Sequence, residues 1–513
     1  MRGRPLILLA ALVALAACNS GSEVTGGSSV DATGGGSSSV PDTTGPSTDS
    51  STPGPTGDAT IDWRATDDPA VETGSLEVLV DPDDPSKGSF QLYVARHLAP
   101  EASRIGSLLV NPGGPGFGGT DLAVFADQIY SEQLLESFDI VAWDPRGTGL
   151  SEPALDCIDD YDAYYTGYDI TPDDDAERQQ IIDLAQEFTE RCVDQNADIL
   201  QYVGTNASAR DMDSLRRALG EDRISYFGFS YGSELGAVWA TLFPDTVRAA
   251  VLDGAADPNA DFVESGLQQS AGFELALTNF LADCSGDPTC AFHHDGDAET
   301  AFDALMLELD ENPIPTTSDR PDLTRGMAIT ATAQAMYSEQ LWPVLADGLA
   351  AAEQGDGEPL LGLFDQYYAR QPDGTWDNSL EAFQVISCMD MPERLTVEED
   401  DATAAEFIAI APRFSPGTTG SYFCTFFPPT DDPAVRVTGA GAGTILVMGT
   451  TGDPATPLES SRAMAAALED GRLVIVDAEG HTGYLPGSCS GDVIDAYLLD
   501  PVGAAPVDGT ECN

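Results

Sequence analysis

Gly228-Phe229-Ser230-Tyr231-Gly232 stands near the middle of the 513-residue chain, between an apolar run at 224–227 and a helical run at 234–242. The apolar run has the length and composition of a buried strand. A G-x-S-x-G sequence at a strand-to-helix turn holds its serine on a strained backbone and exposes the hydroxyl at the end of the sheet. Glycines flank the serine because side chains would clash in so tight a turn. The stretch predicts that Ser230 is a nucleophile.

Further short apolar runs lie on both sides of this turn, and longer helical stretches separate them. Unbroken runs of this kind are typical of parallel strands in a sheet covered on both faces, and they occupy residues 105–110, 138–143, 247–252, 444–448 and 473–476. Upstream, residues 76–80 and 90–95 flank a turn in an alternating pattern, which predicts an antiparallel hairpin. The predicted fold class is α/β, with a mostly parallel, doubly wound sheet and an antiparallel start.

Residues 259–435 break this alternation of strands and helices. The segment is mostly helical and contains two pairs of cysteines; its clearest helical patterns cover 267–282, 299–309 and 327–348. An insertion of helices over the C-terminal edge of the sheet, that is a cap, explains the break. The predicted core then consists of two parts, residues 59–258 and 436–513.

A serine nucleophile needs a base, and the chain has only four histidines. His481 directly follows the last predicted strand, which is where a fold with the chain order serine, acid, histidine keeps its histidine. His97, His293 and His294 are interpreted as solvated or structural. The single lysine, Lys87, lies in the hairpin turn, so a Ser–Lys dyad has no candidate.

The acid of such a triad is expected after the strand that precedes the histidine strand. Asp453 meets this condition, since it follows the run 444–448 and a glycine-containing turn. Its role would be to hold the imidazole tautomer and to stabilise the imidazolium. Asp477 is the alternative, but it lies only four residues before His481 and is interpreted as the end of its own strand.

An oxyanion hole is predicted at Asn111-Pro112-Gly113-Gly114-Pro115-Gly116, which follows the strand that ends at Val110. Glycines allow the backbone to approach the scissile carbonyl and to direct an N–H at the developing charge, worth about 3 kcal/mol per donor. We assign the donors to the amides of Gly114 and Tyr231. A phosphate-binding loop is the weaker alternative because neither G-x-G-x-x-G spacing nor a Walker lysine follows. No cofactor is expected.

The charge balance is strongly acidic, with 22 Lys and Arg against 86 Asp and Glu and a net charge of −64. Such a surface repels phosphate backbones, which excludes nucleic acid as a partner.

The first eighteen residues are predicted to be a targeting signal. Arg2 and Arg4 precede an apolar stretch that is too short to span a bilayer. The stretch ends in Leu15-Ala16-Ala17-Cys18, which resembles a bacterial lipobox with Cys18 as the lipidated residue. Residues 19–58, rich in Gly, Ser, Thr and Pro, have the composition of a flexible tether. We expect export and contact with the outer face of the cytoplasmic membrane only through Cys18; the alternative is an ordinary signal peptide and secretion.

Eight cysteines remain after Cys18, and an even number in an exported chain implies disulfides. Their spacings form no zinc pattern with histidines, so no metal site is expected. Cys284 and Cys290 are close enough for a local loop. For the others we expect pairing in sequence order, although other connectivities are open, and the pairs would be Cys157–Cys192, Cys388–Cys424 and Cys489–Cys512.

Several motifs together resemble the secreted actinobacterial tripeptidyl aminopeptidases, relatives of the prolyl aminopeptidases within the α/β-hydrolases. The resemblance covers residues 60–513 and rests on 111–116, Trp143-Asp144-Pro145-Arg146-Gly147-Thr148-Gly149, Ala209-Arg210-Asp211-Met212-Asp213, 226–244, 449–457 and Gly480-His481-Thr482. It implies hydrolysis of peptides from a free N-terminus beneath a helical cap. Two residues depart from the family pattern, Glu234 where an aromatic is expected and Phe427 where a tryptophan is usual.

An aminopeptidase needs carboxylates that receive the substrate ammonium. Glu274 and Asp390 fall in cap segments that resemble the family and are the candidates, with a cap salt bridge or a solvated surface as the alternative for each. Glu234, one helical turn after Ser230, is interpreted as structural.

The leading hypothesis is an extracytoplasmic serine exopeptidase that releases short peptides, tripeptides by resemblance, through an acyl-enzyme. One alternative is an esterase or another small-molecule serine hydrolase of the same fold, since the fold alone does not fix the substrate. A further alternative is a lipid-anchored binding protein without catalysis, which the complete set of triad residues argues against.

Overall fold

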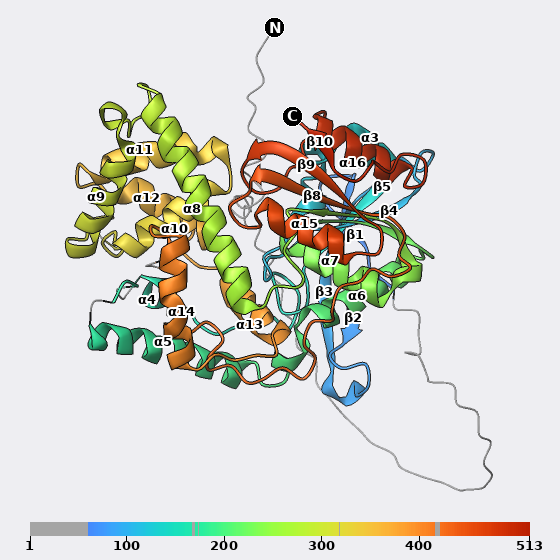
Figure 1. Cartoon of the computed structure of the whole chain (residues 1–513). Coiled ribbons are helices and arrows are strands. Elements are labelled where there is room, and N and C mark those ends of the chain that lie inside the picture. The colour runs from blue at the N-terminus through green and yellow to red at the C-terminus, as the bar shows by residue number, and fades with distance from the viewer. Residues whose placement is uncertain (1–59, 167–169, 173, 318, 416–420) are drawn as a thin grey trace, which may run out of the picture.

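The computed structural model describes residues 60–513 except 167–169, 173, 318 and 416–420 (Figure 1). The predicted signal peptide at 1–18, with Cys18, and the predicted tether at 19–58 lie outside the described residues.

The described residues form one ten-stranded sheet with the order β1-β2-β3-β5-β4-β6-β7-β8-β9-β10. The first three pairs in this order are antiparallel and the other pairs are parallel. The strands are β1 (Arg64–Ala65), β2 (Val71–Leu79), β3 (Ser89–His97), β4 (Gly106–Asn111), β5 (Phe138–Trp143), β6 (Ile224–Phe229), β7 (Val247–Asp253), β8 (Ile445–Gly452), β9 (Gly471–Glu479) and β10 (Thr510–Cys512). The predicted α/β class with an antiparallel start is confirmed; the two shortest strands, β1 and β10, were not predicted.

Both faces of the sheet are covered, as the unbroken apolar strands indicate. On β6, Tyr226 belongs to one apolar core, while Phe227 and Phe229 belong to a second core on the opposite face. The first core contains residues of α6 (Thr205–Ala218), α7 (Tyr231–Leu242) and α15 (Leu458–Ala467). The second contains residues of α1 (Asp121–Val124), α2 (Ala126–Ile129), α3 (Glu132–Ser137) and α16 (Cys489–Leu499).

Among the described residues, seven helices lie between β7 and β8, within the segment 259–435 that was predicted to be a cap. They are α8 (Phe262–Gly286), α9 (Ala298–Glu311), α10 (Arg325–Met336), α11 (Trp342–Ala352), α12 (Glu358–Tyr367), α13 (Ser379–Asp390) and α14 (Val397–Ile410). Most of them lie at the left in Figure 1, and α13 lies nearer the sheet.

A second segment joins this cap. Helices α4 (Tyr161–Tyr165) and α5 (Asp175–Gln195) fall in the stretch 59–258 that was assigned to the core, yet they lie beside α13 and α14 (Figure 1). Arg178 of α5 pairs with Asp401 of α14, and Arg320 pairs with Asp162 of α4 at 2.9 Å. The predicted division therefore needs a correction, because a helical pattern does not reveal which distant helices it packs against.

The helix predicted at 327–348 is two helices. α10 ends at Met336 and α11 begins at Trp342, and a short 3₁₀ turn at Glu339–Leu341 lies between them. The Ser338 side chain accepts a hydrogen bond from the amide of Gln340 at 3.3 Å, which stabilises a new helix start. Pro343 near the start of α11 could not donate to a continuous helix. Because of this break, the backbone carbonyl of Tyr337 is available to accept a hydrogen bond from another segment.

Four disulfides join the eight described cysteines, and the pairs are in sequence order: Cys157–Cys192, Cys284–Cys290, Cys388–Cys424 and Cys489–Cys512. The first joins the loop before α4 to α5, the next two lie within the cap segment, and the fourth joins the start of α16 to the edge strand β10.

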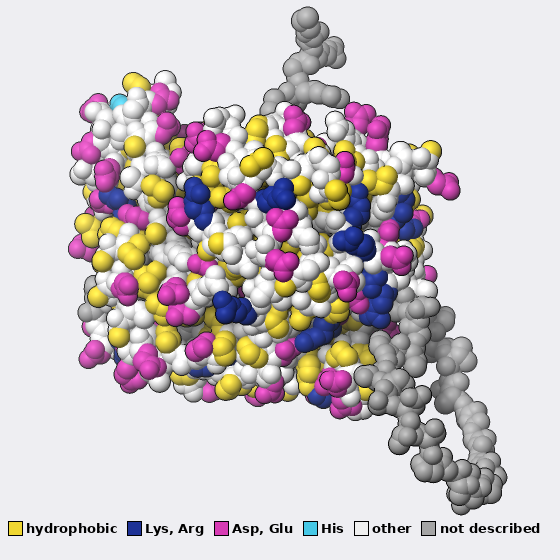
Figure 2. Space-filling view, turned by 45° about the vertical axis from the view of Figure 1, so that its right-hand side comes forward, with side chains coloured by type: hydrophobic (Ala, Val, Ile, Leu, Met, Phe, Trp, Pro, Cys, Tyr) yellow, Lys and Arg dark blue, Asp and Glu magenta, His cyan; other side chains and the backbone are white. Residues whose placement is uncertain are grey.

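Acidic side chains are scattered over the surface rather than gathered in one patch on the face seen in Figure 2. Within the residues that the structure describes, no helix has an apolar stretch long enough to cross a membrane.

Candidate active site

Ser230 lies at the carboxyl end of β6, directly before α7, with φ 55° and ψ −127°. Few residues other than glycine adopt such a backbone, and it is sustained by fixed contacts. The amide of Ser230 donates to the carbonyl of Asp253 at 2.8 Å, and its own carbonyl accepts from the amide of Ser233 at 2.7 Å. The serine is therefore presented at the end of the sheet on a constrained turn.

The two glycines of the motif are required by close contacts. A Cβ on Gly228 would lie 2.2 Å from the carbonyl oxygen of Gly232, and a Cβ on Gly232 would lie 2.8 Å from the carbonyl oxygen of Asn111. Side chains at either position would push the turn apart. These two contacts explain why both positions are glycine.

His481 and Asp453 are in contact at the carboxyl ends of β9 and β8. Nδ1 of His481 lies 2.8 and 2.9 Å from the two carboxylate oxygens of Asp453. The carboxylate also accepts from the amides of Ala455 and Thr456 at 2.9 and 2.8 Å and from the Thr456 hydroxyl at 3.1 Å. Its side chain is 0% exposed, and that of His481 is 8% exposed. A buried carboxylate held in this way fixes the orientation of the ring.

Further contacts hold the histidine loop from the cap and from β7. The amide of His481 donates to the carbonyl of Tyr337 at 3.0 Å, and the two rings pack edge to face with centroids 5.5 Å apart. Asp253 accepts from the amides of Gly483 and Tyr484 at 2.9 and 3.0 Å. The break between α10 and α11 therefore serves to place a carbonyl acceptor against the histidine loop.

Neighbouring carboxylates raise the pKa of His481. Burial alone lowers the pKa of His481, but the negative charge of Asp453, its hydrogen bond to the ring and the charge of Asp253 outweigh burial, and the pKa lies above its ordinary value. Burial raises the pKa of Asp253 to about 7. Nε2 of His481 is buried without a hydrogen-bond partner among the described residues.

The loop at 111–116 lies against the nucleophile turn. A Cβ on Gly113 would lie 2.8 Å from Cβ of Ser230 and 3.1 Å from the amide nitrogen of Tyr231, and Gly113 has φ 103°. The amide of Gly113 donates to the Asn111 side chain at 3.0 Å. The amides of Gly114 and Tyr231 donate to no described residue, so both remain available to an oxyanion.

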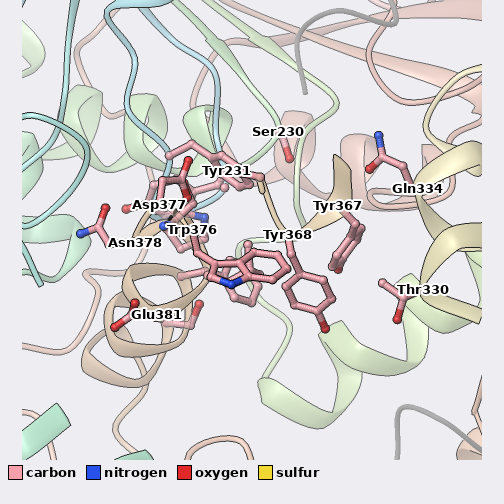
Figure 3. A pocket seen from close by; sticks show the side chains of 18 of the residues that line it. Ser230, Tyr231, Thr330, Gln334, Tyr367, Tyr368, Trp376, Asp377, Asn378 and Glu381 are labelled. Atoms are coloured by element: carbon pink, nitrogen blue, oxygen red, sulfur yellow. Dashed lines mark hydrogen bonds between the residues drawn. The ribbon is translucent and has the colours of Figure 1, made fainter. Parts of the chain in front are cut away.

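A cavity of about 1850 Å³ contains Ser230, Gly114, Tyr231 and His481 in its wall. In Figure 3, Ser230 and Tyr231 lie on one side of it and Tyr367, Tyr368 and Trp376 of the cap lie on the other. Eleven carboxylates and two arginines line the cavity, which gives it a negative potential and favours cationic ligands.

The two predicted amine-binding carboxylates do not line this cavity. Glu274 pairs with the Arg413 guanidinium at 3.2 Å and accepts from the Arg413 amide at 3.0 Å, which makes it part of a cap salt bridge, the alternative weighed for it. Asp390 accepts from the Thr205 amide and hydroxyl at 2.6 and 2.7 Å, at the start of α6. Glu274 is therefore held by Arg413 in the cap, and Asp390 is held by Thr205 outside the cavity wall.

Glu234, which was interpreted as structural, does line the cavity. Phe427 is buried against Phe188 and is not part of the cavity wall.

The alternatives for the triad lie elsewhere. Asp477 is exposed on β9 and accepts from the Thr451 hydroxyl at 3.1 Å. His293 contacts the Cys284 carbonyl, His294 contacts Glu353, and His97 is at the end of β3; none of these three histidines lines the cavity.

Some contributors were not predicted. Asp253 follows the apolar run 247–252 at the carboxyl end of a parallel strand, a position where polar side chains gather at a site. Tyr337 and Thr456 had no such indication, since one approaches from the cap and the other lies three residues after the acid.

Other motif residues are structural. Asp144 accepts from the amides of Gly119, Thr120 and Leu150 and so braces the loop beside the site. Arg146 forms a buried ion pair with Asp211 at 2.6 Å.

Comparison with known proteins agrees with this geometry. The family model of the alpha/beta hydrolase fold matches residues 106–488. Serine protease Hip1 of Mycobacterium tuberculosis is 37% identical over 460 residues, covering 86% of this chain and 86% of the relative. Carboxylesterase B of the same organism is 35% identical over 457 residues, covering 85% of each chain. Tripeptidyl aminopeptidase of Streptomyces coelicolor is 27% identical over 473 residues, covering 86% of this chain and 83% of the relative. The chain is therefore a hydrolase that belongs to the alpha/beta hydrolase fold family.

Proposed function

We propose that the protein is an extracytoplasmic serine exopeptidase that releases short peptides, tripeptides in the first instance, from free N-termini. One observation supports the catalytic part most strongly. The buried Asp453 carboxylate holds Nδ1 of His481, and the ring lines the same cavity as the strained Ser230 turn.

The proposed mechanism assigns one step to each group. His481 takes the proton of the Ser230 hydroxyl through Nε2 as the oxygen attacks the scissile carbonyl. The amides of Gly114 and Tyr231 then donate to the oxyanion, which is worth about 3 kcal/mol for each donor. His481 returns the proton to the leaving amine, and an acyl-enzyme on Ser230 remains for water to hydrolyse. Asp453 keeps the ring in the tautomer with a proton on Nδ1 throughout.

The cap supports exopeptidase action, because its residues line the cavity together with Ser230, and the volume of about 1850 Å³ has room for a short peptide chain. The named activities of two relatives, a serine protease and a tripeptidyl aminopeptidase, agree with peptide hydrolysis. The relative named carboxylesterase B supports an esterase as the second candidate.

A defined peptide distinguishes the two candidates. We expect that the purified protein releases tripeptides in succession from the free N-terminus of an unmodified decapeptide, read as product masses by mass spectrometry. Acetylation of the N-terminus should stop the release, and Ser230→Ala should serve as the inactive control. Hydrolysis of p-nitrophenyl esters together with an intact decapeptide would favour the esterase and contradict the proposal.

The proposed location depends on Cys18. A lipidated cysteine holds a protein on the membrane, whereas residues 19–58 contain too few apolar residues to do so. We expect Cys18→Ala to move most of the protein, expressed in a bacterium that processes lipoproteins, from the membrane fraction to the soluble fraction. Immunoblots of the two fractions provide the measurement. An unchanged membrane fraction would show that something other than Cys18 anchors the protein.

A further inference from the structure

Glu234 is a carboxylate without a partner in the wall of the active cavity. It lies on α7, four residues after Ser230, which corresponds to about 6 Å along the helix axis. It lines the cavity that contains Ser230 and His481. Neither oxygen of its side chain has a hydrogen bond or ion pair with any described residue. Neither oxygen is fully buried either, since both are absent from the described polar atoms that are buried without a partner. The carboxylate is therefore open to a ligand.

A second carboxylate, Asp390, lies close enough to Glu234 for the two charges to interact, and it is fixed by Thr205. The Thr205 hydroxyl also contacts the hydroxyl of Tyr231, the residue next to the nucleophile. Burial, and the charge of Glu234 after it, raise the pKa of Asp390 to about 8, and burial raises the pKa of Glu234 to about 6. Ionisation of Asp390 is therefore disfavoured both by burial and by the neighbouring charge of Glu234.

Among the described residues, no cation forms an ion pair with the Glu234 carboxylate. The two arginines of the cavity wall are Arg320, paired with Asp162 and Asp365 at 2.9 and 2.8 Å, and Arg370, whose carboxylate partner at 3.8 Å is also Asp365. Burial of a carboxylate without a partner costs free energy. The start of α7 offsets part of that cost, since a helix N-terminus favours an acid in its first turn. This effect stabilises the charge but leaves it unpaired.

We propose that Glu234 binds a positively charged group of the peptide substrate one helical turn from the nucleophile. The inference rests on the proposed peptidase function and assigns the amine-binding role to Glu234, since Glu274 is already paired with Arg413. The cation has two possible sources, the N-terminal ammonium of the substrate or a lysine or arginine side chain near the scissile bond. Both present positively charged N–H donors to a carboxylate, and substrates can separate them.

The test compares two pairs of fluorogenic tripeptidyl amides. One pair is Ala-Ala-norleucine with a free or an acetylated N-terminus, and the other is Ala-Ala-lysine against Ala-Ala-norleucine, both with free N-termini. The wild-type protein should prefer the cationic member of at least one pair by its kcat/KM. In Glu234→Gln we expect that preference to fall about tenfold or more, as for loss of one charged hydrogen bond. The pair that responds identifies the source of the cation.

Asp159→Asn is the matched control, because it removes the same charge from an exposed residue on the wall of the same cavity. It should leave both preferences unchanged, which excludes a general effect of the cavity potential. If Glu234→Gln does not fold, as judged by thermal melting, Glu234→Ser provides a smaller neutral replacement.

Three outcomes decide the matter. A preference lost only in the Glu234 variants supports the inference. Equal preferences in wild type and the Glu234 variants, with tripeptidyl amides still cleaved, overturn the inference and leave the proposed function intact. Failure of the wild type to cleave any tripeptidyl amide overturns the proposed function, and the inference with it.

Discussion

Replacement of His481 by alanine should lower kcat for a tripeptidyl amide by about five to six orders of magnitude. The ring is the only imidazole that lines the cavity among the described residues, and its Nε2 has no other partner there. Without it, Ser230 has no base, and only the oxyanion donors and substrate binding remain to accelerate the reaction. The measurement is single-turnover hydrolysis of one tripeptidyl amide, with circular dichroism to show that the variant is folded.

The other three histidines provide controls. His97→Ala, His293→Ala and His294→Ala should each retain most of the wild-type kcat, because none of these residues lines the cavity. His97 lies at the end of β3, His293 contacts the Cys284 carbonyl and His294 contacts Glu353. Loss of hydrolysis in one of these folded variants, together with an active His481→Ala, would show that the triad is wrongly assigned and that the choice of Asp453 is wrong as well.

The elements that could be predicted from the sequence are those whose patterns are local. β4 to β9 are short apolar runs with polar or glycine turns at their carboxyl ends, and parallel strands bring those ends to one edge. Ser230, Asp453 and His481 each follow such a strand, so the sequence predicts that these three residues lie close together at that edge. The flanking glycines follow from the turn itself, as the contacts of Gly228 and Gly232 show.

The features that could not be predicted are contacts between residues that are far apart in the chain. Glu274 was a candidate for the substrate amine because it lies in a cap helix, but Arg413, 139 residues away, pairs with it. Glu234, one helical turn after Ser230, was interpreted as structural, and only the unpaired state of its side chain in the cavity wall indicates a ligand. The packing of α4 and α5 on the cap depends on Arg178 and Arg320, whose partners the helical pattern does not reveal.

The break between α10 and α11 at Tyr337 was missed for a different reason. Residues 327–348 have a nearly continuous helical pattern, and a proline near the start of a helix is compatible with its first turn. The carbonyl of Tyr337 accepts from the amide of His481, so the end of α10 is stabilised by a contact with the catalytic loop. A pattern within one segment contains no information about such a contact.

Asp453→Asn should lower kcat by about four orders of magnitude, whereas Asp253→Asn should lower it far less. Both carboxylates are buried near His481, but only Asp453 contacts the ring, at 2.8 and 2.9 Å from Nδ1. An amide at this position can present its NH₂ group to Nδ1, which places the imidazole proton on Nε2 and removes the base. Asp253 binds the amides of Gly483 and Tyr484, and an asparagine oxygen can still accept there.

The pH profiles of the two variants should also differ. Hydrolysis requires neutral His481, so activity is lost as the pH falls through the histidine pKa, which lies above the ordinary 6.5. The charge of Asp253 contributes to that rise, and its removal in Asp253→Asn favours the neutral ring. The acid limb of kcat/KM should therefore move to lower pH in Asp253→Asn, while its plateau stays close to that of the wild type. Equal losses of plateau activity in the two variants would contradict the assignment of Asp453 as the carboxylate that orients Nδ1 of His481.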